Sequence, residues 1–140
     1  IAMIEHMEKH IGEVGSIVAW HASFENTQNR NMIGMYPAKR PFLNGLINRT
    51  MDLEDLFKEG YVDIEFQGST SIKKILPVLV PDLDYTGMEV ASGTDAMEAW
   101  QRLISLPSGT AKKELRKSML EYCYLDTLAM VRIFEFVQKL

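Results

Sequence analysis

The fold is decided by residues 120–131, which read LEYCYLDTLAMV and lie inside the longest predicted helix, from Ala111 onwards. Apolar residues fall on nearly every side of this helix: Leu115, Met119, Leu120, Leu125, Leu128, Met130, Val131, Ile133, Phe134 and Val137. A helix that is apolar most of the way round is usually buried. We therefore expect the rest of the chain to pack around it.

Asp126 lies in the middle of this helix, with Tyr122 one turn before it. Four residues advance a helix by about 6 Å and turn it by about 40°, so the phenol and the carboxylate share one face. Burying a carboxylate on an apolar helix is costly unless a partner binds it. The sequence leaves three partners open: an arginine, a helix N-terminus or a metal ion.

The composition indicates one soluble globular domain over residues 1–140. Hydrophobic residues make up 46 % and charged residues 24 % of the chain, as is ordinary for such a domain. The net charge of −4 argues against a generally basic nucleic-acid-binding surface. One cysteine excludes an internal disulfide framework and fits a reducing compartment. We expect a cytoplasmic protein with no membrane partner, and the helix-like start at Ile1 suggests a piece of a longer chain.

Periodicity and turn residues predict the order of the elements. The first half reads as a helix over 1–12, a strand over 16–20, a helix from Ser23 to Met35, a loop over 37–45, a strand over 46–51 and a helix over 53–58 capped by Asp52. The second half reads as an extended connection over 61–66, a helix over 72–76 capped by Ser71, a loop over 82–92, a helix capped by Thr94 or Asp95, and the final helix. Strand followed by helix, twice, predicts a helix-rich α/β fold with a small parallel sheet. Trp20, Trp100 and Cys123 are expected in the core.

Four motifs in order resemble the tyrosine subtype of the DEDD exonucleases, which have a ribonuclease H-like fold. They are His21-Ala22-Ser23-Phe24-Glu25 after an apolar strand, Asn48–Leu53, Ser71–Leu76, and Tyr122-x-x-x-Asp126. Gly68–Lys73, Leu76-Pro77, and Tyr122-Cys123 followed by Asp126-Thr127 are similar to an uncharacterised bacterial branch of that superfamily, a domain of unknown function. The resemblance spans essentially the whole chain and implies a ribonuclease H-like fragment with a small residual parallel sheet.

The chain departs from the superfamily pattern at three places. His21 stands where the second signature usually has Asn, and Glu25 stands where it has Asp. The Asp-x-Glu of the first strand, which supplies two of four carboxylates, is expected upstream of Ile1. The fragment would therefore lack the N-terminal strands, and by itself it is expected to be inactive or nearly so.

The resemblance implies phosphodiester hydrolysis with two Mg²⁺ or Mn²⁺ ions about 4 Å apart. Asp126 would bind one ion, Glu25 would bind the other, and Tyr122 would orient the attacking water. His21 would contact Glu25 or the substrate. Each residue also has a structural alternative: an ion pair or cap for Asp126, favourable placement at a helix start for Glu25, and an ordinary packing role for Tyr122 and His21.

Lys73 and Lys74, at the start of a capped helix, are candidates for contact with a phosphate backbone. A pair of solvated lysines is the alternative. Asp52 is expected to be a helix cap.

The resemblance predicts part of a metal-dependent 3′–5′ exonuclease acting on nucleic acid, with DNA slightly favoured over RNA. The alternative is a non-catalytic scaffold that binds nucleic acid or another protein through a nuclease-like fold, and a third reading is a plain helical assembly domain. Family members can carry a further nuclease-like domain upstream. Loss of the first strands would expose a sheet edge, so we also expect homo-oligomers.

Overall fold

A computed structural model describes all residues from 1 to 140 and divides the chain into two compact units. The first unit covers residues Ile1–Ile64 and the second covers Glu65–Leu140. The prediction of one domain over residues 1–140 stays a prediction.

The elements of the first unit are α1 (Ala2–His10), β1 (Ile17–Ala19), α2 (Ala22–Met35), the 3₁₀ turn η1 (Pro37–Lys39), α3 (Arg40–Arg49), β2 (Thr50–Asp52) and α4 (Asp55–Glu59). The 3₁₀ turn η2 (Ile64–Phe66) lies at the boundary. The second unit contains α5 (Ile72–Leu79), α6 (Gly93–Ser105) and α7 (Thr110–Val137). The fold is helix-rich with one small sheet, which confirms the α/β prediction at that level.

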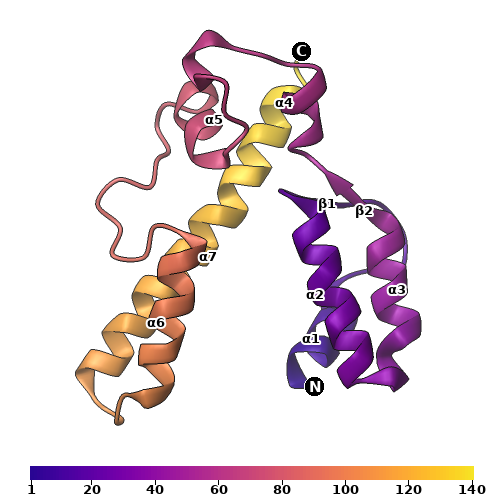
Figure 1. Ribbon diagram of the computed structural model, residues 1–140, viewed down its shortest axis with the longest axis vertical. Helices are drawn as coiled ribbons and strands as arrows, with labels where there is room; N and C mark the ends of the chain where they lie inside the picture. The colour runs from indigo at the N-terminus through magenta and orange to yellow at the C-terminus, as the bar shows by residue number, and fades with distance from the viewer. The chain divides into compact units, whose positions relative to one another are not determined.

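The sheet consists of β1 and β2, which pair in parallel with Ile17 opposite Thr50 and Ala19 opposite Asp52. A parallel pair needs a long connection, and here α2 and α3 provide it, lying side by side (Figure 1). The Leu53 N–H donates to the Ala19 carbonyl at 2.9 Å and extends the ladder beyond β2. As a result, the residues after β1 and the residues after β2 are brought together at one end of the sheet.

Helix α3 replaces most of the predicted loop over 37–45 and the first four residues of the strand predicted over 46–51, whereas Thr50 and Met51 do belong to strand β2. Pro41 lies in the first turn of α3, where a missing N–H costs no hydrogen bond. Leu43 and Leu46, one turn apart, are buried with Ile4 of α1. Proline and glycine suggested a loop in this stretch, but tertiary burial of one helical face decides its structure.

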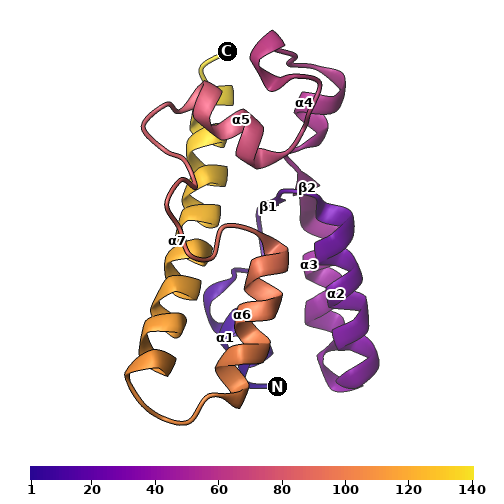
Figure 2. The ribbon, with the colours of Figure 1, turned by 60° about the vertical axis from the view of Figure 1, so that its left-hand side comes forward.

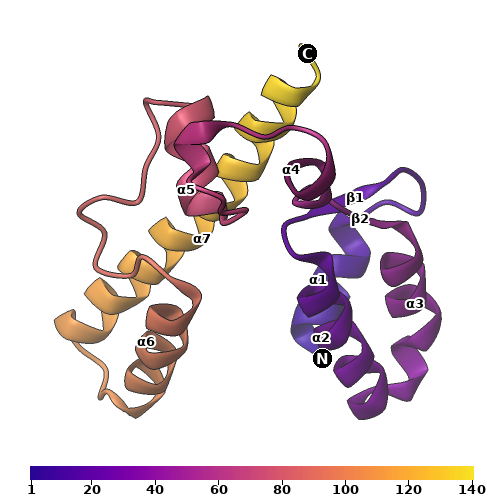
Figure 3. The ribbon, with the colours of Figure 1, turned by 45° about the horizontal axis from the view of Figure 1, so that its top comes forward.

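In the second unit, α6 and α7 form an antiparallel hairpin (Figure 2). Its core contains Val90, Ala99, Leu103 and Leu115. Helix α5 packs against α7 (Figure 3) and buries Ile75 and Leu76 completely. Pro77 lies inside α5.

The expectation that α7 is buried most of the way round was wrong. Its buried residues are Leu115, Ala129 and Ile133, whereas Leu120, Tyr124 and Val131 are exposed. A helix of 28 residues is about 42 Å long, and α5 and α6, with 8 and 13 residues, are together too short to cover it within their unit.

Three smaller expectations also fail. Trp100 is 56 % exposed and Cys123 is exposed, so neither is a core residue. The cap of α6 is Ser92, whose hydroxyl accepts the Asp95 N–H at 3.0 Å, in place of Thr94 or Asp95. Asp95 in turn accepts the Ala91 N–H at 3.2 Å, so the two side chains form a reciprocal cap.

Candidate functional site

Two polar clusters, one in each unit, contain His21, Tyr122 and Asp126 of the residues that the sequence singled out. In the first unit the cluster is organised by Asp52, at the end of β2. One carboxylate oxygen accepts the His21 N–H at 2.9 Å, and the other accepts the Ala22 N–H at 2.9 Å. The Glu54 N–H also donates to Asp52, at 3.1 Å. Asp52 therefore caps α2, across the sheet, as well as the turn that follows β2.

His21 is held in the left-handed region, with φ of 61°, immediately before α2. This conformation is uncommon outside glycine and is maintained here by the two hydrogen bonds to Asp52. The imidazole Nδ1 lies 3.0 Å from Glu54 Oε2. A carboxylate accepts the proton on the nitrogen that faces it, so Glu54 orients the ring of His21.

Lys58 balances the acidic side chains around His21. Its ammonium lies 3.0 Å from Glu54, 3.0 Å from Asp55 and 4.0 Å from Asp52. The hydrogen bonds to Asp55 and Glu54 raise the pKa of Lys58. The cluster is therefore a compact ion network and not a bare group of carboxylates.

Glu25 lies in the first turn of α2, four residues after His21. The side chain is exposed and makes no hydrogen bond or ion pair in the structure. An acidic residue at this position stabilises a helix through its dipole. His21 and Glu25 thus lie near one helix start, as expected, but the imidazole contacts Glu54 and not Glu25.

In the second unit the cluster is built on Asp126 of α7. The hydroxyl of Tyr85, a buried residue between α5 and α6, donates to Asp126 Oδ1 at 2.7 Å. Burial, followed by the hydrogen bond to Asp126, raises the pKa of the Tyr85 phenol. The partner of Asp126 is therefore a tyrosine, which was not among the three that the sequence left open.

Tyr122 belongs to the same cluster. Its ring centroid lies 6.3 Å from that of Tyr85, and it precedes Asp126 by one turn of α7. Burial, followed by the negative charge of Asp126, raises the pKa of Tyr122 to about 12. The predicted proximity of Tyr122 and Asp126 is confirmed, and both phenols stay protonated at neutral pH.

Lys73 and Lys74 begin α5 beside this cluster, at different distances from it. The Lys73 ammonium lies 5.6 Å from the centre of the Tyr85 ring, a cation–π contact. The Lys74 ammonium lies 3.4 Å from Gln67 Oε1. Lys73 therefore shares the environment of Asp126 through Tyr85, whereas Lys74 is held by the turn before α5.

No group of three or more His, Cys, Asp or Glu side chains in the chain is arranged to hold a metal ion. Hard divalent cations require several oxygen ligands. In the second unit the carboxylate of Asp126 already accepts a hydrogen bond from Tyr85. Glu25 belongs to the first unit, and its sharing of a metal site with Asp126 stays a prediction. The residues of neither unit form a metal centre on their own.

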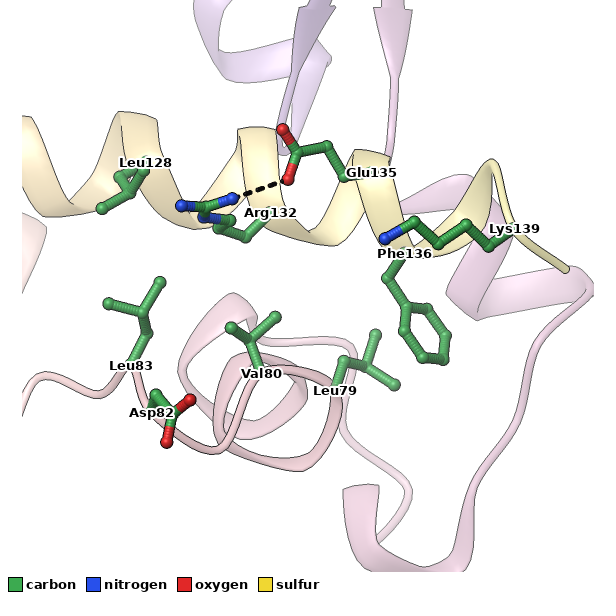
Figure 4. A pocket seen from close by; sticks show the side chains of 9 residues that line it. All are labelled: Leu79, Val80, Asp82, Leu83, Leu128, Arg132, Glu135, Phe136 and Lys139. Carbon is green, nitrogen blue, oxygen red and sulfur yellow. Dashed lines mark hydrogen bonds and ion pairs between the residues drawn. The ribbon is translucent and has the colours of Figure 1, made fainter.

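A pocket of about 400 Å³ lies between the ends of α5 and α7 (Figure 4). Its lining combines apolar with charged side chains: Leu79, Val80, Asp82, Leu83, Leu128, Arg132, Glu135, Phe136 and Lys139. Arg132 is paired with Glu135 at 2.9 Å. None of the predicted site residues lines this pocket. The pocket is therefore separate from the Asp126 cluster.

Two residues of the clusters were missed at the sequence level. Glu54 had a local signal, since it follows Asp52 by two residues in an acidic turn. Tyr85 had none, because 41 residues separate it from Asp126 and it lies in a stretch that reads as a loop. Only the packing of the chain shows that pair.

The fold and the clusters define a helix-rich α/β chain with a parallel strand pair and a carboxylate, Asp126, that accepts a hydrogen bond from Tyr85 beside Tyr122. The chain belongs to the family described as Domain of unknown function (DUF2779), whose model matches residues 1–71. That match includes His21, Glu25 and Asp52 and ends before Tyr122 and Asp126. The curated proteins and the solved structures contain no match to the chain. No helix is long and apolar enough to cross a membrane.

Proposed function

We propose that this chain is part of a metal-dependent 3′–5′ exonuclease that acts on nucleic acid, with DNA slightly favoured over RNA. The observation that carries the proposal is the position of Tyr122 beside Asp126 in one partly buried cluster on α7. A tyrosine one turn before an aspartate is the pair that the resemblance to tyrosine-type exonucleases requires.

In this proposal Asp126 and Glu25 each contribute one carboxylate toward Mg²⁺ or Mn²⁺. The ions would supply charge stabilisation for phosphodiester hydrolysis. The carboxylates within either unit do not complete such a site, so the 140 residues alone are expected to bind these ions weakly and to cleave little or nothing. Tyr122 keeps its proton and can donate a hydrogen bond to a water or phosphate, and His21, Lys73 and Lys74 are the proposed substrate contacts.

The test is a nuclease assay on the complete natural protein with Mn²⁺ or Mg²⁺ and end-labelled single-stranded DNA and RNA. Asp126→Asn keeps the size of the side chain and removes its charge, and a loss of turnover of at least about 100-fold is expected. Glu98→Gln, on the exposed side of α6, is the matched control and should keep full activity. Absence of stepwise shortening by a well-folded wild-type protein would contradict the proposal.

The second candidate is a non-catalytic scaffold that binds nucleic acid or another protein. It is favoured by the engagement of both aspartates in structural hydrogen bonds: Asp126 with Tyr85, and Asp52 with the start of α2. A scaffold predicts that Asp126→Asn leaves ligand binding unchanged and affects only the free energy of unfolding. The same pair of variants therefore distinguishes the two candidates.

A further inference from the structure

Positive charge is concentrated in one part of the second unit, which we call the basic hairpin. It comprises residues 100–118: the end of α6, the connecting loop and the first turns of α7 (Figure 2). It contains five of the 15 lysines and arginines of the chain: Arg102, Lys112, Lys113, Arg116 and Lys117. Glu114 is its one acidic residue, so the basic hairpin carries +4. Because the whole chain carries −4, the remainder carries −8.

Most of this charge is available to a ligand. The side chains of Arg102, Lys113 and Arg116 are exposed and make no hydrogen bond or ion pair within the chain. Lys117 lies 3.5 Å from Glu121, and both side chains are largely in solvent, where such pairs contribute little. Lys112 has a structural role, since its ammonium donates to the Leu106 carbonyl at 3.0 Å and ties the loop to α7.

Trp100 lies on the same side of the hairpin as Lys112 and Arg116. Helix α6 faces α7 with Ala99 and Leu103, and α7 faces α6 with Leu115. Each further residue rotates a helix by about 100°. Trp100 follows Ala99 by one residue, and Arg116 follows Leu115 by one residue, so each is rotated by about 100° from the contact between the helices. Because α6 and α7 run in opposite directions and face each other, these two rotations bring both side chains to the same side of the hairpin.

This side therefore combines an exposed aromatic ring with Arg116, and Lys113 lies one turn before Arg116 on α7. Trp100 is 56 % exposed, although tryptophan side chains are highly buried on average. Aromatic rings next to lysine and arginine are typical of surfaces that bind single-stranded nucleic acid, because bases stack on the ring while cations contact the phosphates.

We propose that the basic hairpin binds single-stranded nucleic acid, with Trp100 stacking on a base and Lys113 and Arg116 contacting the phosphate backbone. The inference rests on the proposed function only in taking nucleic acid as the ligand. A strand is favoured over an anionic membrane by the charge distribution. A membrane presents a broad anionic surface to everything within about 10 Å, including acidic parts of the rest of the second unit, which carries −5, whereas a strand can follow the hairpin alone.

The position of the hairpin suits a substrate that extends toward Asp126. Arg116 and Asp126 are ten residues apart on the one helix α7, which corresponds to about 15 Å. About four stacked nucleotides, at about 3.4 Å each, span that distance. The basic hairpin would then hold the strand away from its reacting end.

The first experiment measures binding of the 140-residue chain to a labelled oligothymidylate of about 15 nucleotides by fluorescence anisotropy, in EDTA and over a salt series. Lys113→Glu together with Arg116→Glu should weaken binding at least tenfold and reduce the salt slope by about 1.4, at about 0.7 for each lost phosphate contact. Lys9→Glu together with Arg30→Glu is the control, since it changes two exposed, unpaired cations of the first unit by the same charge. The control should bind within about twofold of the wild type.

The second experiment tests stacking. Trp100→Ala should weaken binding about tenfold, whereas Trp100→Phe should restore most of the affinity. In a Trp20→Phe background, the fluorescence of Trp100 should be quenched by the oligonucleotide. Circular dichroism checks that each variant is folded. Trp100 is exposed, so its replacement should not disturb the fold. Trp20 is partly buried and stacks on Phe57 at 5.4 Å between ring centroids, and phenylalanine keeps an aromatic ring at that position.

Three results would overturn the inference. The first is that the wild type does not bind the oligonucleotide. The second is that the hairpin and control double variants lose the same amount of affinity. The third is that the chain binds only to phosphatidylserine vesicles, which would assign the hairpin to a membrane surface. Because the binding assay contains no free metal, its outcome is separate from that of the proposed function. Binding without cleavage by the complete protein would refute the exonuclease and leave the inference standing. Cleavage by the complete protein, without binding that depends on the hairpin, would support the exonuclease and refute the inference.

Discussion

Tyr85 and Asp126 join the loop before α6 to the middle of α7 through one short hydrogen bond. The donor is buried, and charged acceptors make stronger hydrogen bonds than neutral ones. Lys73 lies over the same ring, so three segments of the second unit meet at Tyr85. At the residue scale, this tyrosine holds the carboxylate around which the candidate site is built.

We expect Tyr85→Phe to lower the free energy of unfolding by about 1–3 kcal/mol, because it leaves Asp126 without its principal donor. Urea denaturation at pH 7 measures the change. Tyr124→Phe is the control: this phenol is 70 % exposed, and its removal should cost less than about 0.5 kcal/mol. An equal effect of the two changes would show that the hydrogen bond to Asp126 does not stabilise the fold.

The difference in the free energy of unfolding between the wild type and Tyr85→Phe should depend on pH in a predictable direction. The pKa of Tyr85 is raised in the folded protein, so above about pH 10 the unfolded chain loses this proton more readily than the folded chain. The stability that Tyr85 contributes is therefore fully present below about pH 10 and is lost as the pH rises further. The difference between wild type and Tyr85→Phe should shrink accordingly.

At the scale of elements, the start of α2 depends on a residue from another strand. His21 precedes the helix in a left-handed conformation, and its own side chain does not cap the helix. Asp52 supplies both oxygens to the first two N–H groups instead. The cap thereby links the helix start to the end of β2.

Asp52→Ala should destabilise the first unit by about 1–2 kcal/mol, as expected for loss of a cap. Asp55→Ala is a matched control, because Asp55 also pairs with Lys58 but caps no second element, and its loss should cost less than about 0.5 kcal/mol. Thermal unfolding followed by circular dichroism compares the two. Similar losses would assign the effect to the ion network around Lys58.

The elements that were predicted correctly carry local signals, and the others depend on distant partners. Strand β1 was recognised as a short apolar run, and α7 was recognised from the apolar residues that recur along it. Helix α3 was missed because Pro41 and Gly45 suggest a loop, while the burial of Leu43 and Leu46 against α1 is not visible in the sequence. For the candidate site, spacing along one helix was enough to place Tyr122 beside Asp126, but Tyr85 required the folded chain.

At the scale of the whole molecule, the sheet has only two strands, so each strand has one edge that the sheet does not pair. Exposed edges favour pairing with another copy. Met51 of β2 is 56 % exposed, which adds apolar surface to its strand. Self-association stays a prediction, and the structure identifies the edges of β1 and β2 that the sheet does not pair as the surfaces through which it would occur.

We expect light scattering to give a mass above 16.0 kDa at high concentration, and Met51→Lys to lower it, because lysine protects strand edges. Met35→Lys, at the end of α2, is the control; Met35 is 64 % exposed and lies outside the sheet. A mass of one chain at every concentration would contradict the expectation.

Cys123 has a practical consequence. It is the single thiol of the chain, it is exposed, and it lies three residues before Asp126 on α7. A maleimide dye or nitroxide would therefore attach at one known position without removal of other cysteines, and would report on events beside the Tyr85–Asp126 pair. The same thiol can couple two copies by air oxidation, so measurements of mass require a reductant to separate covalent pairs from association through the sheet.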